Sequence, residues 1–334
     1  MISIDDKNHE QHHTDRDHSI LIRCSCLTTI IRNLSFIEEN EFLANDRCLL
    51  NIIERILNCS HQDMHDLFDY DIDVLPSSTD SFSCRNDCNQ QHLMYLLDNT
   101  FVTLSNLSTS IHLCHCYSIT RFRLINIIIH WIICSLSFAN ETFISMIGDD
   151  KIKKEQILIS PRQISLQIFA KLCTNELNVD TILLDLNFKQ LKLFGHTLLS
   201  IMNSSNPEDI DREYCLMIIC SLCKRNQQLV KFFAGKLICI ELIFNYLEFY
   251  EYNQQQYLIA TLTSCYQTNS SIPINTSADM MIDSCIQLLG LFALIKEKNC
   301  LRLFEYKLLE MSSSIYFEQR ILKAFADILF QMKS

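Results

Sequence analysis

The stretch Tyr95-Leu-Leu-Asp-Asn-Thr-Phe-Val-Thr-Leu-Ser-Asn-Leu-Ser108 decides the fold of this chain. Its apolar side chains recur every three or four residues, a spacing that places them on one face of a helix. The residues between them are mostly short and polar, so that a second helix can approach closely. We expect the resulting stripe to be buried; it consists of Leu93, Leu96, Leu97, Thr100, Phe101, Leu104 and Leu107.

A second, strongly apolar stretch follows, from Arg123 to Ser137. It is apolar nearly all round, which predicts a helix that is packed on more than one side. We expect it to pair with the helix that carries the stripe, and we expect His130 and Trp131 to be a packed pair in the core. A helix pair whose second member lies between neighbours is the repeating unit of an α-solenoid.

The composition favours an all-α fold. The chain has 334 residues, of which 48% are hydrophobic, and it contains only four glycines and four prolines. Strand-rich folds need many glycine and proline turns, so their scarcity points to helices joined by polar loops. Apolar helix ends followed by a small residue recur at irregular intervals that bracket the ~40-residue period of armadillo and HEAT repeats. They are Leu34-Ser, Leu107-Ser, Leu136-Ser, Leu172-Cys and Leu222-Cys.

Capping residues mark several helix ends. Ser160-Pro-Arg-Gln163 combines an N-cap serine, a proline at the first helical position and the glutamine of a capping box. Asn206-Pro predicts a second start of this kind, and Asn226 predicts the start of a short helix that ends before Gly235.

The expected domain organisation is a disordered polar tail followed by one armadillo-like helical domain. The tail covers 1–18, where histidines and acidic residues dominate, and the helical domain covers 19–334. Apolar periodicity is interrupted at about 61–91, 137–159 and 263–276, and we expect flexible inserts there.

Charge and cysteine content exclude several functions. The formal net charge is −11, and no basic stripe is evident, so direct DNA binding by this chain is not expected. Seventeen cysteines, mostly on apolar helix positions, indicate core residues in a reducing compartment. No apolar run is long and uninterrupted enough for a membrane span. Nothing in the sequence indicates catalytic residues, a cofactor or an enzymatic activity.

Two groups of residues are candidates for a site. Asp98, Asn99, Asn106 and Trp131 could belong to a partner-binding surface or to a structural motif. Separately, the segment 84–116 contains cysteines and histidines at spacings that resemble zinc half-sites, so that an enzyme using this cluster is one hypothesis. Unligated cysteines are the simpler reading, and whether the cluster binds metal stays open. These residues are Cys84, Cys88, His92, His112, Cys114 and Cys116.

Several segments, taken in order, resemble one known family. The resemblance is to the C-terminal domain of the Osa/BAF-type ARID subunit of SWI/SNF chromatin-remodelling complexes, and it covers about Ser19 to Ser334. The segments that carry it are Arg32-Asn-Leu-Ser-Phe36, Asp98–Ser108, His130-Trp-Ile-Ile-Cys134, Leu158–Gln163, Ala170–Cys173, Asn178-Val-Asp180, Ala278-Asp-Met-Met281 and Asp327-Ile-Leu-Phe-Gln331.

The resemblance implies an armadillo-like scaffold in the nucleus, with no activity of its own and a part in transcription regulation. It implies as partners the core subunits of the complex and the helical region of the ATPase motor. In the family a DNA-binding ARID module lies far upstream, and this sequence contains none. Either the chain is a fragment or a shortened paralogue, or the DNA-binding part is encoded elsewhere. The alternative hypothesis is a cytosolic armadillo-type adaptor for extended peptides, against which the single Trp and the irregular spacing count.

Overall fold

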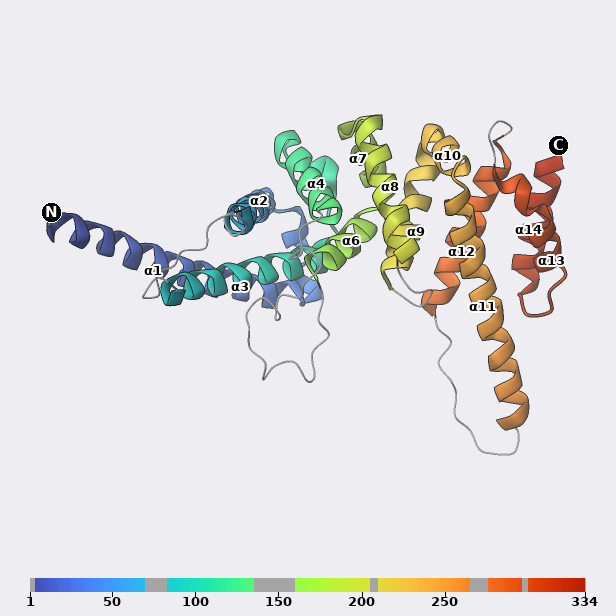
Figure 1. Cartoon of the computed structure of the whole chain (residues 1–334), viewed down its shortest axis with the longest axis horizontal. Coiled ribbons are helices and arrows are strands. Elements are labelled where there is room, and N and C mark those ends of the chain that lie inside the picture. The colour runs from blue at the N-terminus through green and yellow to red at the C-terminus, as the bar shows by residue number, and fades with distance from the viewer. Residues whose placement is uncertain are drawn as a thin grey trace. The chain divides into compact units, whose positions relative to one another are not determined.

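The computed structural model describes residues 4–69, 83–134, 160–204, 210–264, 276–295 and 300–333, and every regular element within them is a helix (Figure 1). This confirms the all-α prediction for the described residues. None of the helices in those ranges has the length and hydropathy of a membrane span. The chain divides into two compact units, Met1–Asn178 and Val179–Ser334, and the division falls within α7 (Glu176–Asp185).

The first unit is built around α3. Its elements are α1 (Ile4–Ser35), η1 (Glu38–Asn45), α2 (Arg47–Asp69), α3 (Ser83–Leu107), η2 (Leu113–His115), α4 (Ser118–Ile133) and α6 (Pro161–Leu172). Helix α3 lies along α1 and also packs against α2 and α6, while α4 packs against α2 and α6 (Figure 1). The stripe predicted on α3 is buried from Leu96 to Leu107. The main partner of α3 is α1, however, and not the next helix in the sequence as we expected.

The second unit consists of α8 (Phe188–Ser204), α9 (Ile210–Arg225), α10 (Gln227–Ala234), α11 (Leu237–Ser264), α12 (Thr276–Ala293), η4 (Cys300–Phe304), α13 (Glu305–Ser312) and α14 (Gln319–Lys333). Helix α12 packs against α9, α10, α11 and α14, and α8 packs against α9, α10 and α11. Aromatic rings fill the interior: Phe244 stacks on Phe304 with ring centroids 5.0 Å apart, and Phe317 meets Phe325 edge-on at 5.4 Å.

Two of the predicted helix starts are confirmed by their hydrogen bonds. The Ser160 hydroxyl accepts from the Gln163 amide at 3.2 Å, with Pro161 at the first helical position of α6. The Asn226 side chain accepts from the amides of Gln228 and Leu229 at the start of α10, which ends at Gly235. The predicted cap at Asn206 lies outside the described residues.

The helices extend further than their apolar patterns indicate. Helix α1 begins at Ile4, within the predicted tail 1–18. Both ends of the insert expected at 61–91 are helical, because α2 continues to Asp69 and α3 begins at Ser83. Polar residues with adequate helix propensity can continue a helix, and apolar periodicity does not detect such turns. The insert at 137–159, and that at 263–276 except for its ends, lie outside the described residues, so their flexibility stays a prediction.

Helix α4 packs against α2 and α6 and so has neighbours on more than one side, as expected, but one side of it is exposed. Trp131 is fully buried, but His130 beside it is exposed, as are Ile119, Phe122 and Arg123. Successive helical residues point about 100° apart, so neighbours in sequence face different surroundings. The expectation of a buried His130–Trp131 pair is therefore wrong for His130.

Candidate functional site

The sequence candidates Asp98, Asn99 and Asn106 come together on the side of α3 that faces α1. Buried polar side chains are concentrated on this helix. The hydroxyls of Thr100 and Thr103 donate to the carbonyls of Leu96 and Asn99, at 2.6 and 2.7 Å. These bonds within α3 satisfy the hydroxyls, so two threonines can lie inside the packed helix pair without a partner on α1.

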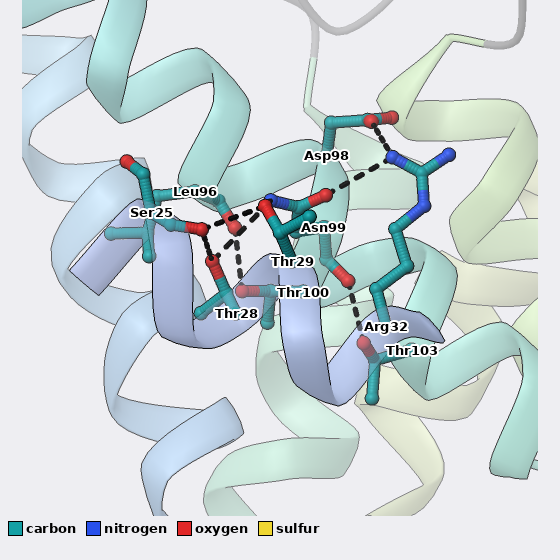
Figure 2. A network of polar contacts seen from close by, with 9 residues as sticks. All are labelled: Ser25, Thr28, Thr29, Arg32, Leu96, Asp98, Asn99, Thr100 and Thr103. Atoms are coloured by element: carbon teal, nitrogen blue, oxygen red, sulfur yellow. Dashed lines mark hydrogen bonds and ion pairs between the residues drawn. The ribbon is translucent and has the colours of Figure 1, made fainter. Parts of the chain in front are cut away.

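Asp98 and Asn99 bind α1 through one arginine (Figure 2). The Arg32 guanidinium donates from Nη1 to Asp98 Oδ2 at 2.8 Å and to Asn99 Oδ1 at 3.0 Å. The Asn99 amide in turn donates to the hydroxyls of Thr29, at 2.9 Å, and Thr28, at 3.4 Å. Both ends of a buried amide are thereby paired with the neighbouring helix.

Other polar contacts join α1 to α3 seven residues before and seven residues after Asn99. Towards the start of α3, the Ser25 hydroxyl donates to the His92 carbonyl at 3.3 Å, and towards its end the Asn106 amide donates to the Ser35 hydroxyl at 3.0 Å. Residue numbers rise together on both helices, so α1 and α3 run parallel. We name this set the polar seam; it consists of Ser25, Thr28, Thr29, Arg32, Ser35, His92, Asp98, Asn99 and Asn106.

The polar seam fixes the register of the two helices. Apolar side chains tolerate a shift along a helix, but a shift by one turn would leave Asn99 and Asn106 without their partners. Burial raises the pKa of the Asp98 carboxyl, although the charge and hydrogen bond of Arg32 act in the opposite direction. Asp98 is thus a carboxylate that depends on Arg32 to remain charged inside the interface.

We expect Arg32→Ala to destabilise the chain by about 1–2 kcal/mol at neutral pH, because it leaves Asp98 and the Asn99 carbonyl oxygen without their donor. Without the charge and hydrogen bond of Arg32, which lower the pKa of Asp98, this pKa should be higher in the folded variant than in the folded wild-type chain. The carboxyl of the variant is therefore protonated first as the pH falls, and the loss of stability should shrink through the acid range. Urea unfolding of the variant and the wild-type chain at several pH values measures this loss of stability. The double variant Arg32→Ala/Asp98→Asn should recover part of the loss; a loss independent of pH and of Asp98 would contradict this account.

Trp131, the fourth sequence candidate, lies away from the polar seam. Its ring is fully buried and meets Phe101 of α3 edge-on, with centroids 5.4 Å apart. Such aromatic pairs add to the stability that burial alone supplies. Trp131 is therefore a core residue that connects α4 to α3.

A cluster of asparagines, which sequence analysis missed, holds the connection between α3 and α4. Asn178 accepts from the Leu113 amide at 2.8 Å and donates to the carbonyls of Ile111, at 2.8 Å, and Leu172, at 3.2 Å. Asn45 accepts from the His112 amide and donates to the Ser110 carbonyl, both at 3.1 Å. Asn residues between apolar helices are a weak signal, because an amide that clamps a loop and one that faces water look alike in sequence.

The cysteine and histidine residues do not form a ligand set where the structure describes them. In those parts of the chain, no three His, Cys, Asp or Glu side chains converge as metal ligands. His112 Nδ1 lies 3.1 Å from the Asn175 amide, and burial raises the pKa of Cys116, which favours its neutral thiol. The side chains of Cys84 and Cys88 lie outside the described residues, so the complete 84–116 cluster is not tested.

Cys220 and Cys223 are core residues of the second unit. Both thiols are buried in α9, and burial raises the pKa of each. Reactive cysteines have the opposite property, a lowered pKa at an exposed position. Cys220-Ser-Leu-Cys223 has the spacing of a thioredoxin motif, but its buried thiols lack the exposure and lowered pKa of that motif.

A comparison with protein-family models matches residues 19–281 to the family of SWI/SNF-like complex subunits BAF250/Osa. This chain belongs to that family. The Trithorax group protein osa of Drosophila melanogaster is similar at 22% identity over 327 residues, which is 96% of this chain. The chain spans 12% of the length of that relative.

The BAF250/Osa region contains the polar seam, the asparagine cluster and Trp131, and it ends within α12 at residue 281. The resemblance drawn from the sequence is thus confirmed for most of its extent. Helices α13 and α14 follow the matched region and complete the packing of the second unit through α12. The residues singled out as Asp98, Asn99, Asn106 and Trp131 hold helices of this family domain together; a direct contact of theirs with a partner stays untested.

Proposed function

We propose that this chain is a non-enzymatic scaffold subunit of a SWI/SNF-like chromatin-remodelling complex, acting in the nucleus in transcription regulation. Its armadillo-like stacked helices would hold the core subunits and the helical region of the ATPase motor. The observation that carries this proposal is the BAF250/Osa family match over residues 19–281. Because the related osa protein is far longer, the activity of a whole remodelling subunit is not transferred to this chain directly.

The internal polar contacts support a scaffold. The polar seam joins α1 to α3, and a second set joins α3 to α6, where Lys171 Nζ donates to the Ser105 carbonyl at 2.8 Å and the Ser105 hydroxyl donates to Gln167 at 3.0 Å. Burial lowers the pKa of Lys171. Helices fixed in this way present a preformed surface, which reduces the entropy lost when a partner binds.

The outer face of α1 offers apolar anchors for a partner helix. Leu27 and Ile30 are 59% and 55% exposed, and Leu34 is exposed one turn further along α1. Phe36, which follows α1, and Phe42 of η1 are exposed as well. Residues 27, 30 and 34 follow the spacing by which a helix contacts another helix across a groove or seam. We propose that this face of α1 contacts a helical region of another subunit.

The direct test is co-purification of the tagged full chain from nuclei with mass spectrometry, followed by pull-down of the motor's helical region. We expect Leu27→Glu/Ile30→Glu to lower recovery of the partner at least about tenfold, because charges replace exposed anchors. Phe330→Glu, at a residue that is 75% exposed on α14, is the matched control and should retain binding. Melting temperatures verify that all variants fold.

Failure to recover any remodelling subunit, together with tight binding of duplex DNA that weakens steeply with salt, would refute the scaffold assignment. We expect weak DNA binding at most, given the net charge of −11. The comparisons give no support to the alternative of a cytosolic adaptor for extended peptides.

A further inference from the structure

A basic and aromatic surface lies on the second unit, on α8 and beside α10. Lys192 Nζ lies over the Phe188 ring at 4.6 Å, and Lys236 Nζ lies over the Phe232 ring at 5.3 Å. The imidazole of His196, one turn after Lys192, meets Phe232 edge-on with centroids 5.0 Å apart. We name this surface the basic–aromatic patch; it consists of Phe188, Lys192, His196, Phe232 and Lys236.

The packing of α8 on α10 holds the patch in place. A Cβ added to Gly195 would lie 2.9 Å from Cζ of Phe233 and 3.0 Å from Cε1 of Phe232, so a larger residue would force these rings to shift. Phe233 is buried, and Phe232 packs against it with centroids 4.9 Å apart. The ring that contacts both His196 and Lys236 therefore has a fixed position.

The charges of the patch are uncompensated within the described part of the chain, where neither Lys192 nor Lys236 pairs with a carboxylate. Other basic residues of the same unit do pair: Arg225 with Asp180, and Arg320 with Asp283. Burial and the ammonium groups of Lys236 and Lys192 lower the pKa of His196. Three cationic or protonatable groups thus repel one another in a chain whose net charge is −11.

We propose that the basic–aromatic patch binds an acidic segment of a partner protein, with carboxylates between Lys192, His196 and Lys236 and an apolar side chain against Phe232. An anion placed there removes the mutual repulsion of these groups. The exposed Leu193, between Lys192 and His196 in α8, extends the apolar part of the surface. This inference does not depend on which subunits the chain holds through α1.

A protein segment fits the patch better than nucleic acid does. Duplex DNA presents one phosphate per ~1.7 Å of its axis and is attracted by extended basic surfaces. The patch has two lysines and one histidine on a chain with net charge −11, so a long polyanion would meet repulsion beyond it. A short acidic peptide with an apolar residue matches both the charge and the rings.

Fluorescence anisotropy of the full chain with a labelled peptide of alternating glutamate and leucine tests the proposal. We expect Lys192→Gln/Lys236→Gln to weaken binding about tenfold at low salt, the sum of one exposed and one half-buried charge interaction. Lys224→Gln/Lys323→Gln removes two exposed charges from α9 and α14 and should leave affinity nearly unchanged. Equal effects of the two double variants, or no effect of the first, would overturn the proposal.

Two further measurements separate the possible ligands and locate the carboxylates. Unlabelled duplex DNA of equal total charge should compete more weakly than the peptide. Stronger competition by DNA would mean that the patch binds nucleic acid and would refute the proposal.

The pKa of His196, followed by its NMR resonances, should rise when the peptide binds, because carboxylates stabilise the imidazolium. An unchanged pKa would show that no carboxylate lies beside His196, which also refutes the proposed placement.

Discussion

Replacing Trp131 by alanine is expected to lower the free energy of unfolding by about 3–5 kcal/mol, the range for removal of a large buried aromatic side chain. Trp131 is fully buried, and its loss also removes the edge-on contact with Phe101. The cavity would lie between α4 and α3, so the first unit should show the lower stability. Urea unfolding followed by circular dichroism measures the change.

Two variants control this prediction. Trp131→Phe keeps a ring against Phe101 and should cost clearly less than the alanine variant. Ile119→Ala lies on the same helix at a residue that is 61% exposed, and its effect should stay within about 0.5 kcal/mol. A melting temperature that Trp131→Ala leaves unchanged would mean that the ring is in solvent, and a binding role would then be the better reading.

Replacing Asn178 by alanine is expected to cost about 2–4 kcal/mol, because one amide and two carbonyls lose their partner in a buried place. The groups concerned are the Leu113 amide and the carbonyls of Ile111 and Leu172. The connection between α3 and α4 should loosen first, and hydrogen exchange at the Leu113 amide should accelerate.

Asn178→Asp separates the two halves of this contact, because it keeps the acceptor for Leu113 but replaces the donor to both carbonyls. We expect it to be destabilising as well, since a carboxylate would face two carbonyl oxygens. Asn253→Ala, at an exposed position of α11, is the matched control and should be nearly neutral. If Asn178→Ala were equally neutral, water would have to pair with the Leu113 amide and the two carbonyls in place of the Asn178 side chain.

Local patterns in the sequence predicted the helices well, and they predicted the partners of those helices poorly. The apolar stripe from Leu96 to Leu107 is buried as expected, and the caps at Ser160 and Asn226 make their hydrogen bonds. These features depend on residues a few positions apart. The pairing of α3 with α1 depends on residues about 70 positions apart, and no local period encodes it.

For the candidate residues, too, the sequence indicated the residues but not their distant partners. Asp98, Asn99 and Asn106 were predicted to belong to a partner-binding surface or a structural motif, yet their partners Arg32, Thr29 and Ser35 could not be named from the sequence. The basic–aromatic patch was missed because Lys192 lies in α8 and Lys236 follows α10, far apart in the chain. The packing of α8 on α10 brings them to one surface, and no local period encodes that packing.

The parallel arrangement of α1 and α3 has a consequence for the nascent chain. The contacts between them join residues separated by 66–71 positions, from Ser25 with His92 to Ser35 with Asn106. Helix α1 therefore leaves the ribosome before its principal partner has been synthesised, and the buried Thr28 and Ser35 remain in water until α3 follows. Closing so long a loop precedes any gain from the pairing, which makes this step slow and leaves apolar surface available to chaperones. Truncations that end before α3 would keep α1 permanently in that unpaired state.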